Sequence, residues 1–210
     1  MRIWNPSFKR CNVNKELTTR AADFAGTSIA APWLRNAGIV LAASVLLATC
    51  AHIALPLLFT PVPLTLQPFA VLLLGLLLSP RMAGVAVATY LAEGALGLPV
   101  FAPTAGLPGG IAHLFGPTGG YLMAYPAAAV LIAWLRRRIP GRFASALAAA
   151  AAGDLLILLC GALWLTVATH APLRAVLPLA VLPFLPGDAL KVAAAAGAAT
   201  GFRRLRRQNP

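Results

Sequence analysis

The sequence predicts an all-α integral membrane protein, a bundle of six transmembrane helices with both termini in the cytoplasm. Of its 210 residues, 60% are hydrophobic and only 10% are charged, whereas soluble domains have about a quarter of their residues charged. Several apolar stretches reach the roughly 20 residues that a helix needs to cross a hydrocarbon core. The net charge of +12 lies in the tails and a few short loops, so it indicates topology and not a nucleic-acid-binding surface. We therefore expect the helices to be surrounded by the lipid bilayer.

The first three helices are predicted from apolar runs between polar or proline-containing breaks. One covers residues 37–53 and stops before Pro56, because proline disfavours helical backbone in the residue that precedes it. An uncharged loop follows. The second and third helices cover residues 64–78 and 82–96, on either side of the turn at residues 79–81. This link is too short to leave the membrane surface.

Three further helices follow a loop rich in glycine and proline. The loop, residues 97–116, has neither a helical period nor an unbroken apolar run, and long loops of this kind are usually functional or disordered. Helices are predicted over residues 117–138 and 143–169, separated by a Pro-Gly-Arg turn. The last helix covers residues 187–202. Four prolines interrupt the segment before it, which is either a short separate helix or a piece that lies on the membrane surface.

The distribution of Lys and Arg over the short loops sets the orientation. With both termini inside, the outer loops hold Arg174 alone, and the inner side holds Arg20, Arg35, Arg81, Arg136, Arg137, Arg138, Arg142, Arg203, Arg204, Arg206 and Arg207. Six crossings fit this alternation, whereas five or seven would place a basic cluster outside. We therefore expect a multi-pass protein of the cytoplasmic membrane.

Three regions are expected along the chain: a disordered polar leader over residues 1–34, the six-helix domain over residues 35–202, and a basic cytoplasmic tail over residues 203–210. The leader lacks the continuous apolar run of a secretory signal. A start codon assigned too early would also explain it, and a targeting or docking arm is the alternative.

Ionisable residues inside the apolar stretches are the candidates for function, because charge inside a membrane is costly. Four qualify: Glu93, Asp154, Asp188 and Lys191. Glu93 lies near the outer end of the third helix, and Asp188 and Lys191 lie at the outer start of the last. Gln67 lies at the outer start of the second helix, so these residues are expected at one membrane face. Asp154, nearer the middle of its helix, is interpreted as a satisfied polar contact inside the bundle.

The pair Asp188 and Lys191 is the sharpest local feature. Residues three apart share a helix face, and a helix start favours acceptors and anions. One face thus offers a carboxylate acceptor together with an ammonium donor. The alternatives are that Asp188 only pairs with its own Lys191, and that Glu93 is a solvated residue of the membrane interface.

Sequence motifs of common enzymes are missing. None of the three lysines follows a glycine, so the chain has no P-loop and cannot be its own ATP-hydrolysing motor. HExxH and GxSxG are also absent. The histidines share no metal-ligand spacing, and the three cysteines form no CxxC pattern. We therefore expect that the protein is not an enzyme, and that it has no catalytic residue, no metal-binding residue and no cofactor.

Small residues recur at every fourth position on two of the predicted helices. Gly38 and Ala42 lie on the first, and Ala193, Gly197 and Gly201 lie on the last. Such faces let helix backbones approach closely in lipid. They serve either packing inside the chain's own bundle or docking to a separate membrane subunit, and the sequence leaves both open.

Four segments carry a resemblance to a known family. They are TPVPLTLQ at residues 60–67, YLAEGALGLPVF at 90–101, GPTGGYL at 116–122 and PFLPGDALK at 183–191. In this order they resemble the BioY family, the biotin-specific S components of energy-coupling-factor (ECF) transporters, over residues 37–202. The resemblance implies a biotin site near the outer surface, with ligand contacts at Gln67, Glu93, Tyr121, Asp188 and Lys191. It also implies two kinds of partner, a transmembrane coupling subunit and ATP-binding cassette ATPases.

The chemistry of biotin agrees with these residues. Its ureido ring has two N–H donors and one carbonyl acceptor, which Asp188 and either Gln67 or Lys191 can pair. Some family members place an arginine after the LPVF motif for the carboxylate, but this chain has none between Arg81 and Arg136. The carboxylate is left to Lys191, to amides of the glycine-rich loop, or to solvent.

Two other functions remain as alternatives from the sequence. One is a self-sufficient secondary carrier for another small vitamin or organic anion, which Asp188 and Lys191 would also permit. The other is a membrane enzyme acting on lipid or prenyl groups. Such an enzyme needs a cluster of acidic or histidine residues in mid-membrane, where only Asp154 is available.

Overall fold

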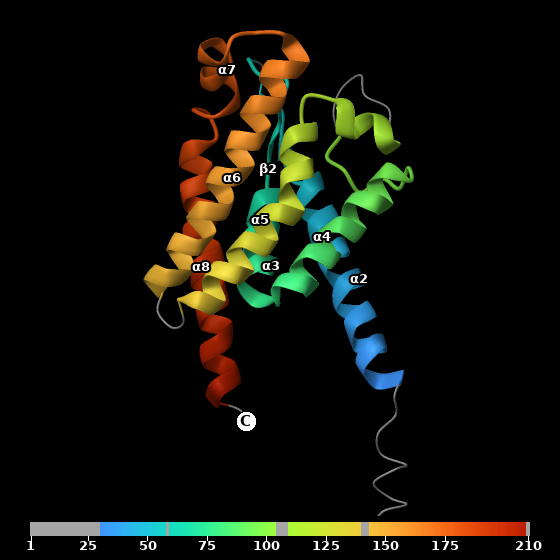
Figure 1. Ribbon diagram of the computed structural model, residues 1–210, viewed down its shortest axis with the longest axis vertical. Helices are drawn as coiled ribbons and strands as arrows, with labels where there is room; N and C mark the ends of the chain where they lie inside the picture. The colour runs from blue at the N-terminus through green and yellow to red at the C-terminus, as the bar shows by residue number, and fades with distance from the viewer. Residues whose placement is uncertain (1–29, 58, 104–108, 140–142, 209–210) are drawn as a thin grey trace, which may run out of the picture. The chain divides into compact units, whose positions relative to one another are not determined.

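The computed structural model describes residues 30–57, 59–103, 109–139 and 143–208 (Figure 1). The chain divides into two compact units, Met1–Gly38 and Ile39–Pro210, and the bundle below belongs to the second. The described chain is mostly helical. Its elements in order are α2 (Ala30–His52), β1 (Ala54–Leu55), β2 (Leu64–Thr65), α3 (Gln67–Leu77), α4 (Pro80–Ala95), the 3-10 helix η1 (Gly110–Phe115), α5 (Gly119–Arg138), α6 (Phe143–Thr169), α7 (Leu173–Ala180) and α8 (Leu185–Gln208).

Helix α2 begins at Ala30, earlier than the predicted start at residue 37. Pro32 lies in its first turn, where a missing N–H costs nothing because the first helical N–H groups have no intrahelical partner. The last residues of the predicted leader are therefore helical. Residues 1–29 lie outside the described part of the chain, so the disorder predicted there stays a prediction.

The expectation of a purely helical chain needs one correction. Ala54–Leu55 and Leu64–Thr65 pair as a two-stranded antiparallel sheet, the first in the predicted uncharged loop and the second at the predicted start of the second helix. Helix α3 consequently starts at Gln67 and not at residue 64. Helix α4 follows after a short turn, with Ser79 as its N-cap accepting from Met82 N and with Pro80 as its first residue.

The second half of the chain contains the longest helices and a bend. Helix α6 has the predicted bounds, 143–169, and a turn of 3-10 helix, η1, lies within the loop predicted to be irregular. The proline-interrupted segment forms the short helix α7, which is bent by 55° from α8. Helix α8 runs to Gln208 and so includes most of the predicted basic tail. There Arg203 Nη2 donates to Leu76 O over 2.6 Å, a cation at the carbonyl end of α3.

By length and composition, α2 and α6 are each apolar enough to cross a membrane, and α7 with α8 makes a third candidate if the bent pair is one span. Leu155, Leu159 and Leu163 recur at every fourth position of α6 and are exposed. An exposed apolar face of this kind marks a surface that contacts lipid or another protein. The described chain is thus a mostly helical protein with two or three candidate membrane spans.

Helices α3, α5, α6 and α8 pack around one another through leucine and isoleucine side chains of α3 and α5 and through alanines of α6 and α8. On α8 the packed face consists of Val192, Ala195, Ala196 and Ala199. The small-residue face at Ala193 and Gly197 is instead exposed, and a Cβ added to Gly197 would meet no atom within 4 Å. The described bundle therefore does not use that face for its own packing.

Candidate functional site

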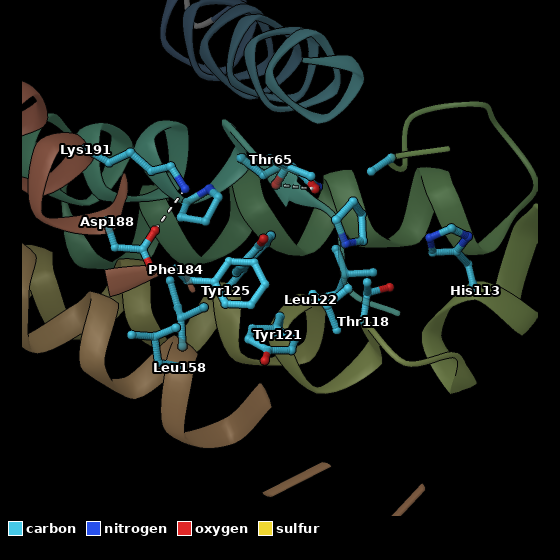
Figure 2. A pocket seen from close by; sticks show the side chains of 16 residues that line it. Thr65, His113, Thr118, Tyr121, Leu122, Tyr125, Leu158, Phe184, Asp188 and Lys191 are labelled. Atoms are coloured by element: carbon cyan, nitrogen blue, oxygen red, sulfur yellow. Dashed lines mark hydrogen bonds and ion pairs between the residues drawn. The ribbon is translucent and has the colours of Figure 1, made fainter. Parts of the chain in front are cut away.

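A pocket lies where the first turns of α3, α5 and α8 meet. Its empty space is about 530 Å³, part of it open to solvent, and its polar lining side chains are Thr65, Gln67, His113, Thr118, Tyr121, Tyr125, Asp188 and Lys191 (Figure 2). The N-terminal end of a helix carries free N–H groups and a partial positive charge. Here the N–H groups of Gly119, Leu185 and Asp188 already donate within the chain, and Pro68 and Pro186 have none. The three helix starts therefore act mainly through their partial positive charge, which favours an acceptor or an anion.

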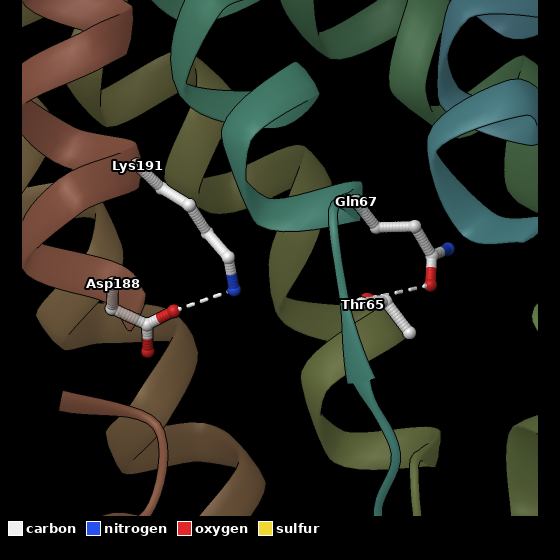
Figure 3. Close-up of polar contacts among 4 residues, drawn as sticks. All are labelled: Thr65, Gln67, Asp188 and Lys191. Atoms are coloured by element: carbon white, nitrogen blue, oxygen red, sulfur yellow. Dashed lines mark hydrogen bonds and ion pairs between the residues drawn. The ribbon is translucent and has the colours of Figure 1, made fainter. Parts of the chain in front are cut away.

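Asp188 and Lys191 pair with each other in the wall of this pocket. Lys191 Nζ donates to Asp188 Oδ1 over 2.8 Å, and the two residues are only 9% and 4% exposed (Figure 3). The backbone N–H of Asp188 donates to Phe184 O, which fixes the helix start. Burying an ion pair is costly unless its geometry is good and its other polar capacity is used. The ion pair considered as an alternative is present, and it presents an acceptor and a donor to the pocket.

Gln67 lines the pocket, but its amide already has partners. Its Nε2 donates to Tyr90 Oη over 2.6 Å, Tyr90 Oη donates to Val100 O over 2.8 Å, and Gln67 Oε1 accepts a long hydrogen bond of 3.4 Å from Thr65. In Figure 3 the amide points away from the Asp188–Lys191 pair. Gln67 is therefore a fixed part of the wall, held by a tyrosine that the sequence did not indicate as its partner.

The aromatic ring of Tyr121 forms part of the pocket wall. Its hydroxyl donates to Ala180 O over 2.7 Å, in the last residue of α7. A Cβ on Gly161 would lie 2.2 Å from the ring, so glycine is needed there for α5 and α6 to pack around it. The ring of Phe184 lies next to the ring of Tyr121, with the centroids 6.3 Å apart. These contacts fix the ring as an apolar wall.

Two acidic residues of the apolar stretches lie outside the pocket lining. Glu93 is half-buried and accepts a hydrogen bond from Ser44 Oγ, which joins α4 to α2. Asp154 is 7% exposed, and its Oδ1 has no hydrogen-bond partner among the described residues. The interpretation of Asp154 as a satisfied contact is thus wrong for that oxygen. It lies one turn of α6 away from Ile157 and Leu158, which line the pocket.

The other end of the pocket has polar groups that the sequence did not single out. Figure 2 shows Thr118 and His113 far from Asp188 and Lys191, with the rings of Tyr125 and Phe184 nearer the charged pair. Burial lowers the pKa of His113 from its usual 6.5, which favours the neutral imidazole. Thr118 belongs to the GPTGGYL segment, but a hydroxyl has no charge and the cost of charge in a membrane gives no signal for it.

No three His, Cys, Asp or Glu side chains of the described ranges come close enough together to hold a metal ion. What the pocket offers within those ranges is therefore hydrogen bonding and shape. It has one charged, donor-and-acceptor end, a second polar end and aromatic walls.

Comparison with known proteins gives consistent results. The sequence model of the BioY family matches residues 18–208, so the match includes the second half of the predicted leader. A protein of Pyrococcus horikoshii described as a probable biotin transporter BioY is 43% identical over 135 residues, which is 64% of this chain and 76% of that protein. The biotin transporter BioY of Thermotoga maritima is 38% identical over 172 residues, 82% of this chain and 96% of that protein.

A solved structure has the same fold. The crystal structure of the S-component for biotin from an ECF-type ABC transporter superimposes with a TM-score of 0.75. The two sequences are 27% identical, and the alignment covers 84% of this chain and 93% of the other.

Proposed function

The chain belongs to the BioY family, and from this membership we propose that it takes up biotin as the substrate-binding S component of an ECF-type transporter. The family resemblance found in the sequence is confirmed. The similar proteins are described as biotin transporters, and the similar structure is that of an S-component for biotin. Transport, and not an enzymatic reaction, is the activity of this family.

The observation that carries the proposal is the buried Asp188–Lys191 pair in the pocket wall. The biotin ureido ring has two N–H donors and a carbonyl acceptor, and the pair supplies the matching acceptor and donor. Charge-assisted hydrogen bonds of this kind are roughly twice as strong as neutral ones. Within the site, Asp188 and Lys191 bind the ureido ring, while Tyr121 and Gln67 form walls that position the ligand.

Glu93 stands apart from these residues. Its carboxylate faces Ser44 and does not line the pocket in the structure. The ligand contact that the resemblance implies for Glu93 stays a prediction, and it requires the Ser44 hydrogen bond to open.

Titration of biotin into the purified chain in detergent tests the proposed function. We expect saturable heat with one biotin bound per chain, and no comparable heat with thiamine or riboflavin. Equal and weak binding of all three vitamins would contradict the proposal and favour a carrier for another small solute.

The membrane arrangement that we propose has six crossings with both termini in the cytoplasm. What supports it is the distribution of charge along the helices: α5 and α8 have the pocket at their first turns and basic residues at their last. Basic residues favour the cytoplasmic side. The pocket then opens to the outside of the cytoplasmic membrane, where the solute is captured.

A reporter enzyme fused after the last residue tests this arrangement. Alkaline phosphatase, active only in the periplasm, is expected to be inactive in that position, while green fluorescent protein is expected to be fluorescent. Active phosphatase at the C-terminus would show that the number of crossings is odd or the orientation reversed.

We also propose that the chain works with a transmembrane coupling subunit and ATP-binding cassette ATPases. The sequence has no P-loop of its own, so energy from ATP must come from a partner. The exposed small-residue face of α8, at Ala193 and Gly197, supports a close helix contact with a membrane subunit.

A further inference from the structure

The hydroxyl of Thr118 is a buried polar group in the pocket wall. Thr118 is 9% exposed, it lines the pocket, and its Oγ1 has no hydrogen-bond partner among the described residues. It occupies the N-cap position of α5, yet its side chain makes no capping hydrogen bond. A buried hydroxyl is normally hydrogen-bonded. A buried hydroxyl that faces a pocket and lacks a hydrogen bond therefore indicates a position where a bound ligand supplies the partner.

The start of α5 next to this hydroxyl is held rigidly. A Cβ on Gly119 would lie 1.8 Å from Leu114 O, and one on Gly120 would lie 2.1 Å from Trp164 Cβ, so both positions require glycine. Trp164 Nε1 donates to Gly116 O over 2.9 Å, which fixes the turn that leads into the helix. Helix α5 has 20 residues. The Gly119 N–H already donates to Gly116 O over 3.0 Å, so the N–H groups of Gly120 and Tyr121 and the dipole of the helix are what its first turn offers to an anion.

The charged residues of the pocket decide which end of the ligand binds next to Thr118. The only acidic residue in its described lining is Asp188, at the opposite end (Figure 2). Lys191 is there as well, but its ammonium already pairs with Asp188 at 2.8 Å. A ligand carboxylate at that end would face a second carboxylate, whereas at the start of α5 it meets a hydroxyl donor and the positive end of a helix.

We propose that Thr118 Oγ1 and the first turn of α5 bind the carboxylate of the ligand, a subsite that takes the place of an arginine. The inference rests on the proposed function, since it takes biotin as the ligand and the Asp188–Lys191 end as the ureido site. The two polar ends of the pocket then match the two polar ends of biotin, and the apolar part of the ligand lies between them against the aromatic rings.

The test compares Thr118→Val with the wild type, using biotin and its neutral methyl ester as the titrants. Valine keeps the shape of threonine and removes the hydroxyl. We expect Thr118→Val to lose about tenfold in affinity for biotin, because a hydrogen bond to a charged group is lost. The affinity for the ester should change by less than about twofold, since an ester oxygen is a weaker acceptor than a carboxylate.

Two controls keep the result interpretable. Thr166→Val removes a hydroxyl that bonds Ala162 O within α6, and it should leave both affinities unchanged. Thr118→Ser keeps the hydroxyl and should keep the preference for biotin, even if the valine variant is poorly folded. Equal losses for biotin and ester, an unchanged biotin affinity, or a serine variant as weak as valine would overturn the inference. A wild type that binds neither ligand contradicts the proposed function instead.

Discussion

Asp188→Asn is expected to weaken biotin binding by roughly thirtyfold or more while the protein stays folded. Asparagine keeps the size of the side chain and removes its charge. Asp188 is 4% exposed, and its carboxylate both accepts from Lys191 and lines the pocket. Removing one partner of a buried, hydrogen-bonded charge pair typically costs about 2–5 kcal/mol, because the other charge is left unpaired. Titration calorimetry with biotin measures the loss directly.

Asp154→Asn is the matched control for this change. It alters the same chemical group in the same bundle, but Asp154 does not line the pocket. Its effect on biotin affinity should stay within about 1 kcal/mol. If the Asp188–Lys191 pair served stability alone, Asp188→Asn would leave the affinity unchanged and lower the unfolding temperature. That outcome would show that the Asp188–Lys191 pair stabilises the fold and does not bind the ligand.

Gly120→Ala is expected to destabilise the protein by about 1–3 kcal/mol or more through overpacking. The new Cβ would lie 2.1 Å from Trp164 Cβ and 2.7 Å from the backbone oxygen of Cys160. Neither atom is the flexible end of a side chain, so α5 and α6 must separate. Because Gly120 lies in the first turn of α5, the same change should also displace the pocket wall. Thermal unfolding in detergent, with and without biotin, measures both effects.

Gly197→Ala provides the comparison. Gly197 lies within α8, and a Cβ there would meet nothing within 4 Å. Alanine in a helix interior is favoured over glycine by up to about 1 kcal/mol. The variant should therefore unfold at the wild-type temperature or slightly above it. Equal unfolding temperatures for the two variants would show that the α5–α6 contact is looser than the structure has it.

The positions of the helices could be predicted because their signals are local. Apolar runs and prolines gave α6 its bounds and gave α3 and α4 theirs within a few residues. The start of α2 was missed because Pro32 and the polar residues Arg35 and Asn36 interrupt the apolar run before residue 37. The end of α8 was missed because its last turns are basic, and local hydrophobicity excludes them. The pairing of Ala54–Leu55 with Leu64–Thr65 is too short to have a periodic pattern.

The pocket could be predicted only in part, because partners across helices are not local. Gln67, Tyr121, Asp188 and Lys191 all line it, as the shared membrane face and the family motifs indicated. The sequence has no pattern that joins Glu93 to Ser44, since that contact depends on how α4 packs against α2. Ion pairs three residues apart are the exception, and the Asp188–Lys191 pair was anticipated for that reason.

The chain of hydrogen bonds from Thr65 through Gln67 and Tyr90 to Val100 O has a consequence for the energetics of capture. It immobilises the Gln67 wall before any ligand arrives. Ordering a flexible side chain on binding costs about 0.5–1.5 kcal/mol, and here that entropy is already lost during folding. The site is in this sense preorganised along one wall. A small solute with few atoms has little interaction energy to spare, so a wall that needs no rearrangement lowers the free-energy cost of capturing it.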